Sequence, residues 1–121
     1  MACDFRGYIF PEIVKLRPAV IVSPTHLHRP GLVTVVPLST TAPVPICPYH
    51  YKLLGNPIPG ESVETWAKCD MVATVSIEHR LDRIKIARGE YRIGNVSMDQ
   101  VREIRLCIVR SLGIELPAVR P

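Results

Sequence analysis

The chain has 121 residues, of which 47% are hydrophobic, so it is long enough for one compact domain with a real core and too short for two. Its formal net charge of +4 favours an anionic partner such as nucleic acid. The four cysteines lack the close pairs of a structural zinc site, and no apolar run is long enough to span a membrane. We therefore expect a single cytoplasmic domain over residues 1–121, with reduced thiols, no metal and no other cofactor.

The first half of the chain favours β-strands. Residues 1–5 predict a short edge strand, and the glycine and proline within 7–16 predict a loop. The runs 19–23 and 32–38 are rich in β-branched apolar residues, so they predict two strands joined by a turn. Three prolines predict a stiff, extended connector over 42–48.

The second half continues this pattern and ends in a helix. Alternating or β-branched segments predict strands over 50–54, 63–69, 83–87 and 91–94. The last quarter switches to helical spacing, with one face made by Val101, Ile104, Ile108 and Leu112. The expected fold is α+β and mainly β: a strongly curved sheet or small barrel with one C-terminal helix packed on it.

Both ends of this helix carry recognisable signals. Ser97 and Gln100 form a capping box, in which the serine hydroxyl accepts from the Gln100 amide and the Gln100 side chain reaches back. Gly113 stands where a left-handed cap would end the helix.

Arg17 precedes the predicted strand 19–23, and Pro18 biases it toward an extended conformation. A guanidinium at the mouth of a buried strand suits phosphate or the charge that develops on it. The alternative is a surface arginine paired with Glu12 or another acid. If the strand ends converge, this cation meets the polar groups that follow the other strands.

Two further polar groups follow strands. The hydroxyls of Ser39 and Thr40 can donate to a phosphate oxygen or cap a short turn. Lys68 and Asp70 are two residues apart, so in a strand they share a face. They can therefore belong to one site or form an ordinary surface ion pair.

Histidines and a basic run add candidate RNA contacts. His26 and His28 lie in the turn after the first long strand, and His50 stands between two tyrosines, close to Lys52. Such an aromatic and basic group can stack unpaired bases or simply pack on a sheet surface. The basic segment 79–92, which includes Arg80 and Arg83, fits either a phosphate-tracking face or a solvated edge strand.

The order of these segments resembles the PemK/MazF family of toxins from bacterial type II toxin–antitoxin systems. The matching segments are 17–24, 35–41, 66–71, 74–75, 80–81 and 111–113. The resemblance implies a dimeric SH3-like β-barrel with a helix, and a cognate antitoxin whose tail covers the RNA groove. It also implies metal-independent cleavage of single-stranded mRNA to 2′,3′-cyclic phosphate and 5′-hydroxyl ends.

The resemblance also assigns residues, with serine here at a position where the family has threonine. Arg17 would stabilise the transition state, Ser39 or Thr40 would donate to a non-bridging oxygen, and Asp70 would take or position the 2′-hydroxyl proton. The expected RNA contacts are Lys68, His26, His28, His50, Lys52, Arg80 and Arg83. The alternative is a non-catalytic toxin that binds an enzyme, as the CcdB toxins do with this fold, or a decayed toxin that binds a protein partner.

Overall fold

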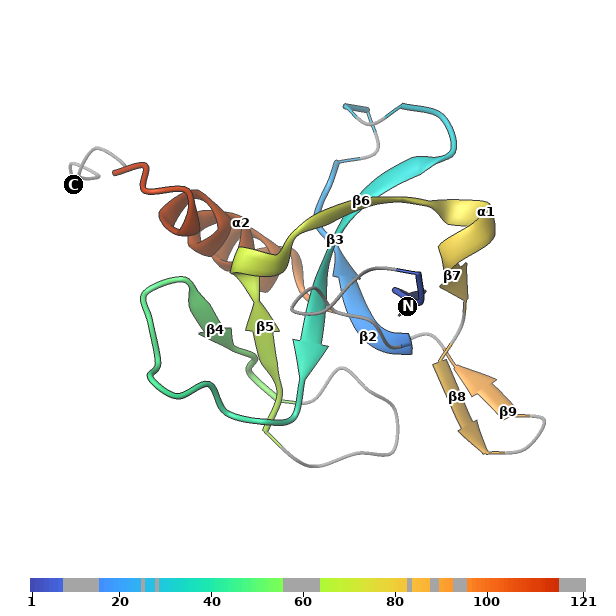
Figure 1. Cartoon of the computed structure of the whole chain (residues 1–121), viewed down its shortest axis with the longest axis horizontal. Coiled ribbons are helices and arrows are strands. Elements are labelled where there is room, and N and C mark those ends of the chain that lie inside the picture. Colours follow the sequence, from blue (N-terminus) through green and yellow to red (C-terminus); the bar gives the residue numbers. More distant parts are fainter. Residues whose placement is uncertain are drawn as a thin grey trace.

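The computed structural model describes residues 1–7, 16–24, 26–27, 29–55, 64–82, 84–87, 90–92 and 96–115. The strands are β1 (Ala2–Asp4), β2 (Leu16–Ile21), β3 (Leu32–Ser39), β4 (His50–Lys52), β5 (Trp66–Lys68), β6 (Ala73–Ser76), β7 (Leu81–Asp82), β8 (Ile84–Ala87) and β9 (Glu90–Arg92). The helical segments are η1 (Cys69–Met71), α1 (Ile77–Arg80) and α2 (Met98–Ser111) (Figure 1). The predicted class, mainly β with one principal C-terminal helix, is confirmed.

Seven strands form one sheet whose pairings are antiparallel. The order is β4-β5-β3-β2-β1-β7, and β6 is an additional neighbour of β3. β8 and β9 form a separate hairpin, which stands apart from the sheet (Figure 1). The expected barrel is therefore an open sheet in the described part of the chain, because no pairing joins β4 to β7 there.

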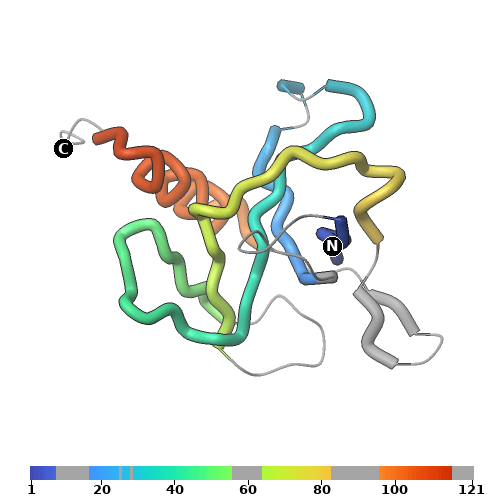
Figure 2. The backbone as a smooth tube through the Cα atoms, in the orientation of Figure 1, coloured from blue at the N-terminus to red at the C-terminus, as the bar shows by residue number. Residues whose placement is uncertain are grey.

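Strand β3 organises the sheet because it pairs along both edges. One edge pairs with β2, and the other pairs first with β6 and then with β5. β6 sets Ala73 opposite Val35, and β5 sets Ala67 opposite Leu38. Between these two pairs β3 has two residues and the facing chain has five, so three extra residues bulge out as η1. Figure 2 shows the chain from β5 through η1 to β6 as one continuous path along β3.

The two faces of the sheet carry separate cores. Strand side chains alternate between faces, so Val20 and Val36 point toward α2, whereas Ala19 and Val35 point to the other side. We call these the helix face and the far face. Cys3 of β1 belongs to the far-face core. Any polar residue in phase with Ala19 and Val35 therefore lies on the far face.

The ends of α2 follow the sequence signals, with one difference. The Ser97 hydroxyl accepts a hydrogen bond from the Gln100 amide at 3.2 Å, and Gly113 has φ +74°, so both predicted caps are confirmed. The predicted return of the Gln100 side chain is wrong. Its Oε1 accepts from the Leu54 amide at 2.7 Å and so ties the helix to the chain after β4.

The apolar face of α2 also differs from the prediction at its C-terminal end. Val101 and Ile104 are buried as expected, and Ile108 packs against the same core. Leu112 is 66% exposed because it follows Ser111, the last helical residue. Cys107 is buried in its place.

Several strand predictions need correction. The first strand is not an edge, because β1 pairs with β2 on one side and β7 on the other. β2 begins at Leu16, earlier than predicted, and β6, β7 and the short helix α1 were not predicted. Most of the predicted loop over 7–16 lies outside the described residues. All four cysteines are unpaired, and no helix in the described ranges is long and apolar enough to cross a membrane.

Candidate nucleic-acid interface

The central strands β2 and β3 carry Arg17 and Ser39 near the same end of the sheet. β2 and β3 pair Ile21 with Val35 and Ala19 with Pro37. Arg17 and Ser39 each lie two residues beyond the last of these pairs, in β2 and β3 respectively. Both residues are in phase with the far-face side chains, and Arg17 is the direct partner of Cys3 in β1. The predicted guanidinium and hydroxyl therefore come from adjacent strands on one side of the sheet.

The next two strands extend this arrangement across the far face. Trp66 of β5 stands opposite Ser39 on one side and Lys52 of β4 on the other. One alternation further along, Lys68 pairs with His50. We call the polar and aromatic far-face residues at this end of the four strands the cationic face. Its members are Arg17, Ser39, His50, Lys52, Trp66 and Lys68.

The cations of this face are accessible to an anion. Arg17 and Lys68 are half-buried, and the side chain of neither forms a hydrogen bond or ion pair with another described residue. The predicted alternative partner of Arg17, Glu12, lies outside the described residues. Lys52 is paired with Glu64 at 2.7 Å, but this pair is exposed and therefore weak enough to exchange for a phosphate.

The Ser39 hydroxyl has both of the predicted capacities. Its Oγ accepts a hydrogen bond from the Thr41 amide at 3.1 Å, which stabilises the turn after β3. The hydroxyl proton is left to donate to another acceptor. Thr40 is exposed and follows the last residue of the strand, so Ser39, and not Thr40, belongs to the paired part of β3.

The contacts of His50 define its tautomer. The Cys47 amide donates to its Nδ1 at 2.9 Å, so this nitrogen carries no proton and Nε2 carries it. The ring lies 4.6 Å from that of Tyr49, with an interplanar angle of 56°. Because the Nδ1 lone pair is occupied, His50 can donate a hydrogen bond to a phosphate but is poorly arranged to accept a proton.

The expectation that Lys68 and Asp70 share a strand face is wrong, since β5 ends at Lys68 and Asp70 lies in η1. The two described side chains form no ion pair with each other. Asp70 is exposed, and its charge reaches Tyr49. A hydrogen bond to Cys47 is the main cause that raises the pKa of Tyr49, and the Asp70 carboxylate adds to it.

Of the other predicted contacts, His26 and Arg80 lie within the described residues. His26 is exposed in the turn between β2 and β3, at the end of the hairpin away from Arg17 and Ser39. Arg80 donates to the carbonyls of Asp4 and Arg6 at 2.7 and 3.1 Å, and so holds the end of β1. The two remaining predicted contacts, His28 and Arg83, lie outside the described residues.

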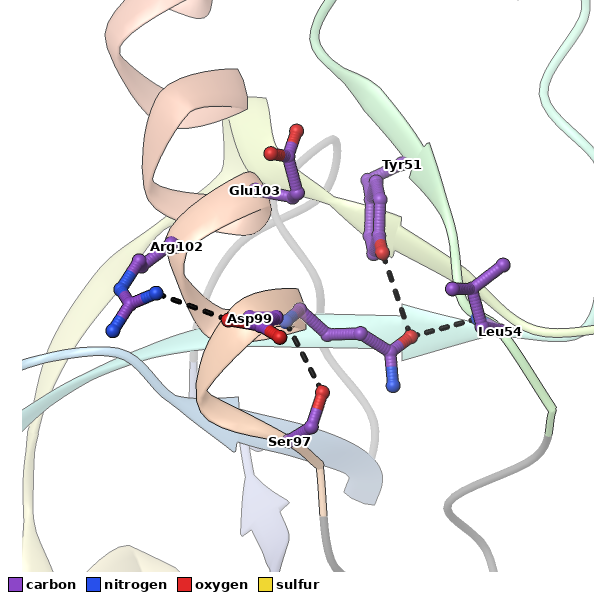
Figure 3. A pocket seen from close by; sticks show the side chains of 7 residues that line it. Tyr51, Leu54, Ser97, Asp99, Arg102 and Glu103 are labelled. Atoms are coloured by element: carbon purple, nitrogen blue, oxygen red, sulfur yellow. Dashed lines mark hydrogen bonds and ion pairs between the residues drawn. The ribbon is translucent and has the colours of Figure 1, made fainter.

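A pocket of about 510 Å³ opens on the opposite side of the sheet, between β4 and the start of α2 (Figure 3). Tyr51 and Glu103 line it, and the Tyr51 hydroxyl approaches the Gln100 side chain at 3.5 Å. Burial is the main cause that raises the pKa of Tyr51, and the charge of Glu103 adds to it. The wall of this pocket includes the carboxylates of Asp99 and Glu103 and the guanidinium of Arg102. It does not include any member of the cationic face.

Sequence reasoning did not identify Trp66 as a site residue. It is 8% exposed, and its position between Ser39 and Lys52 depends on pairings among strands that are distant in the sequence. The only available signal was its place two residues before Lys68, which puts both side chains on one face of a strand.

The chain matches a known protein family. Residues 1–112 match the model described as PemK-like, MazF-like toxin of type II toxin–antitoxin system. The chain therefore belongs to the PemK/MazF family of toxins. Comparison with curated protein sequences gave no significant match.

Solved structures of low sequence identity share the fold. MazF from Deinococcus radiodurans (form I) superimposes with a TM-score of 0.69 at 19% identity, covering 93% of this chain and 91% of that one. A mycobacterial endoribonuclease in complex with its cognate antitoxin gives 0.64 at 21% identity, covering 96% and 92%. Mycobacterium tuberculosis toxin MazF-mt6 gives 0.61 at 18% identity, covering 87% and 94%.

Proposed function

We propose that this toxin is a metal-independent, sequence-specific endoribonuclease that cleaves single-stranded mRNA to 2′,3′-cyclic phosphate and 5′-hydroxyl ends. The observation that carries the proposal is that Arg17 and Ser39, on the neighbouring strands β2 and β3, are in phase with the same sheet face as Lys68. Family membership supports it, since the similar mycobacterial structure is described as an endoribonuclease.

The residues suit an in-line displacement at phosphorus. Asp70 accepts the 2′-hydroxyl proton, the 2′-oxygen bonds to phosphorus, and the bond to the 5′-oxygen breaks; this oxygen then takes a proton from solvent. Arg17 stabilises the charge on the phosphoryl oxygens, and Ser39 donates to one of them. Lys68 and the Nε2–H of His50 hold a neighbouring phosphate. His50 has no proton-accepting role because its Nδ1 is occupied.

We further propose that the chain works as a homodimer and is inhibited by a cognate antitoxin. The similar mycobacterial endoribonuclease is seen with its own antitoxin, which supports such a partner. The connector between β3 and β4 exposes Val44 and Ile46 by 95% and 62%, and burial of these side chains would favour an assembly. Light scattering on the chain alone and with the candidate antitoxin measures both associations.

Incubation of a single-stranded RNA oligonucleotide with the purified chain, in the presence of a chelator, tests the activity. We expect 2′,3′-cyclic phosphate and 5′-hydroxyl ends, and we expect one 2′-deoxy substitution at the cut site to abolish cleavage. Arg17→Ala should lower the single-turnover rate about 100- to 1,000-fold, since it removes a transition-state contact.

Arg102→Ala is the matched control, because it removes the same charge from an exposed, Asp99-paired arginine on α2. We expect its rate to stay within about threefold of wild type. Intact RNA under these conditions, or equal rates for the two arginine variants, would refute the proposed chemistry.

A further inference from the structure

The indole of Trp66 is a hydrogen-bond donor without an acceptor. Among the described residues, its Nε1 is the buried side-chain polar atom that has no partner. The side chain is 8% exposed. Because an unsatisfied buried donor costs stability, such an atom in a folded protein calls for an explanation. A ligand that supplies an acceptor is one explanation, and the surroundings of Trp66 favour it.

Trp66 lies in a row of groups that can all donate. The Trp66 indole stands between the Ser39 hydroxyl and the Lys52 ammonium, and the Arg17 guanidinium extends the row from β2, the neighbour of β3 on its other edge. Three of these four groups can only donate. A polymer that presents acceptors at regular intervals along an anionic backbone complements such a row.

The length of the row exceeds one nucleotide. Neighbouring strands are about 4.8 Å apart, so the four strands span about 14 Å. One step of a stacked strand advances about 3.4 Å along its axis. If Arg17 and Ser39 hold the phosphate that is cut, Trp66 therefore falls beside a neighbouring linkage of the same RNA.

We propose that Trp66 is an RNA-binding residue, whose indole N–H donates to a phosphate oxygen next to the cleaved linkage. This inference depends on the proposed nuclease function, and it adds a residue and a second phosphate to that site. The enclosed nitrogen has already lost its hydration in the free protein, so the new bond carries no further desolvation cost for the donor. The acceptor must displace the groups that enclose the nitrogen, so Trp66 positions the RNA and is not a catalytic residue.

The chain has a single tryptophan, which makes the test direct. In protein labelled with ¹⁵N at the indole, one cross-peak reports on Trp66 alone. We expect titration with an uncleavable, 2′-deoxy-substituted oligonucleotide to move this peak downfield and to slow the exchange of its proton with water. We then replace one phosphate at a time with an uncharged methylphosphonate. We expect the response to be lost at one position, next to the cut site.

Two variants measure the contribution to binding. Trp66→Phe keeps a ring but removes the donor, so it should weaken binding of this oligonucleotide about 10- to 100-fold, as expected for a hydrogen bond to a charged acceptor. Tyr51→Phe removes a ring hydroxyl from the helix face of β4, where Tyr51 packs against the other core, and should change affinity less than about twofold. Thermal unfolding shows whether either variant is folded.

The results separate this inference from the proposed nuclease. If the wild-type chain cleaves RNA and binds the oligonucleotide while the indole peak does not move, the role of Trp66 is wrong and the nuclease stands. An equal response with every methylphosphonate overturns the phosphate contact. If the chain neither binds nor cleaves RNA, both proposals are wrong.

Discussion

Replacement of Ser39 by alanine separates the two capacities of its hydroxyl. The hydroxyl accepts one hydrogen bond, from the Thr41 amide at 3.1 Å at an exposed site, so its loss should lower the free energy of unfolding by only about 0.5–1.5 kcal/mol. Loss of a donor to the phosphoryl oxygen should lower the cleavage rate about 100- to 1,000-fold. Single-turnover cleavage with excess enzyme and urea unfolding of the same samples measure both quantities.

Two neighbouring variants sharpen this experiment. Ser39→Thr keeps the hydroxyl and suits a strand, so it should retain cleavage within about tenfold of wild type. Thr40→Ala removes an exposed hydroxyl beyond the end of β3, and should cost less than about fivefold. A Ser39→Ala chain that cleaves within about twofold of wild type would refute the role of this hydroxyl, and a larger effect of Thr40→Ala would move the role to its neighbour.

Three further predictions concern stability. Ile104→Ala should lower the free energy of unfolding by about 2–5 kcal/mol because the side chain is fully buried, whereas Leu112→Ala, at 66% exposed, should stay within about 0.5 kcal/mol; similar urea midpoints would contradict this. Gln100→Ala removes the acceptor that ties α2 to the chain after β4, so denaturation should show a loss of about 0.5–1.5 kcal/mol, and an unchanged midpoint would mean that this bond contributes nothing. Burial raises the pKa of Cys69 to about 12 and of Cys3 to about 11 from 9.0. The unfolded chain thus loses these protons first, so the free energy of unfolding should fall between pH 9 and 11 by up to about 1.4 kcal/mol per pH unit for each thiol. A chain with both cysteines replaced by alanine should lack this slope, and an equal slope in that chain would contradict the prediction.

Local signals predicted the parts of the fold that depend on neighbours in sequence. The caps of α2 are set by Ser97 and Gly113, and each acts within a few residues. The β-branched run of β3 likewise predicts its own strand. The signals failed where a distant partner decides the outcome. The Gln100 side chain accepts a hydrogen bond from the Leu54 amide, 46 residues away in the sequence, instead of returning to its own helix cap.

The candidate site shows the same division. Residue type made Arg17 and Ser39 candidates, because guanidinium and hydroxyl groups at strand ends suit phosphate, and the family resemblance assigned them. The place of Trp66 beside Ser39 required the pairing of β3 with β5. Lys68 and Asp70 were assigned to one strand face because the sequence gives no sign that η1 begins directly after Lys68.

Which face of the sheet Lys68 occupies depends on the number of residues inserted at η1, between β5 and β6. Three inserted residues are an odd number, so even-numbered side chains of β5, such as Lys68, and odd-numbered ones of β6, such as Val75, point the same way. Deleting one residue from this segment would reverse that parity. Either the lysine would turn toward the helix or Val75 would turn out of its core. The number of residues in this segment therefore determines which face of the sheet receives the lysine.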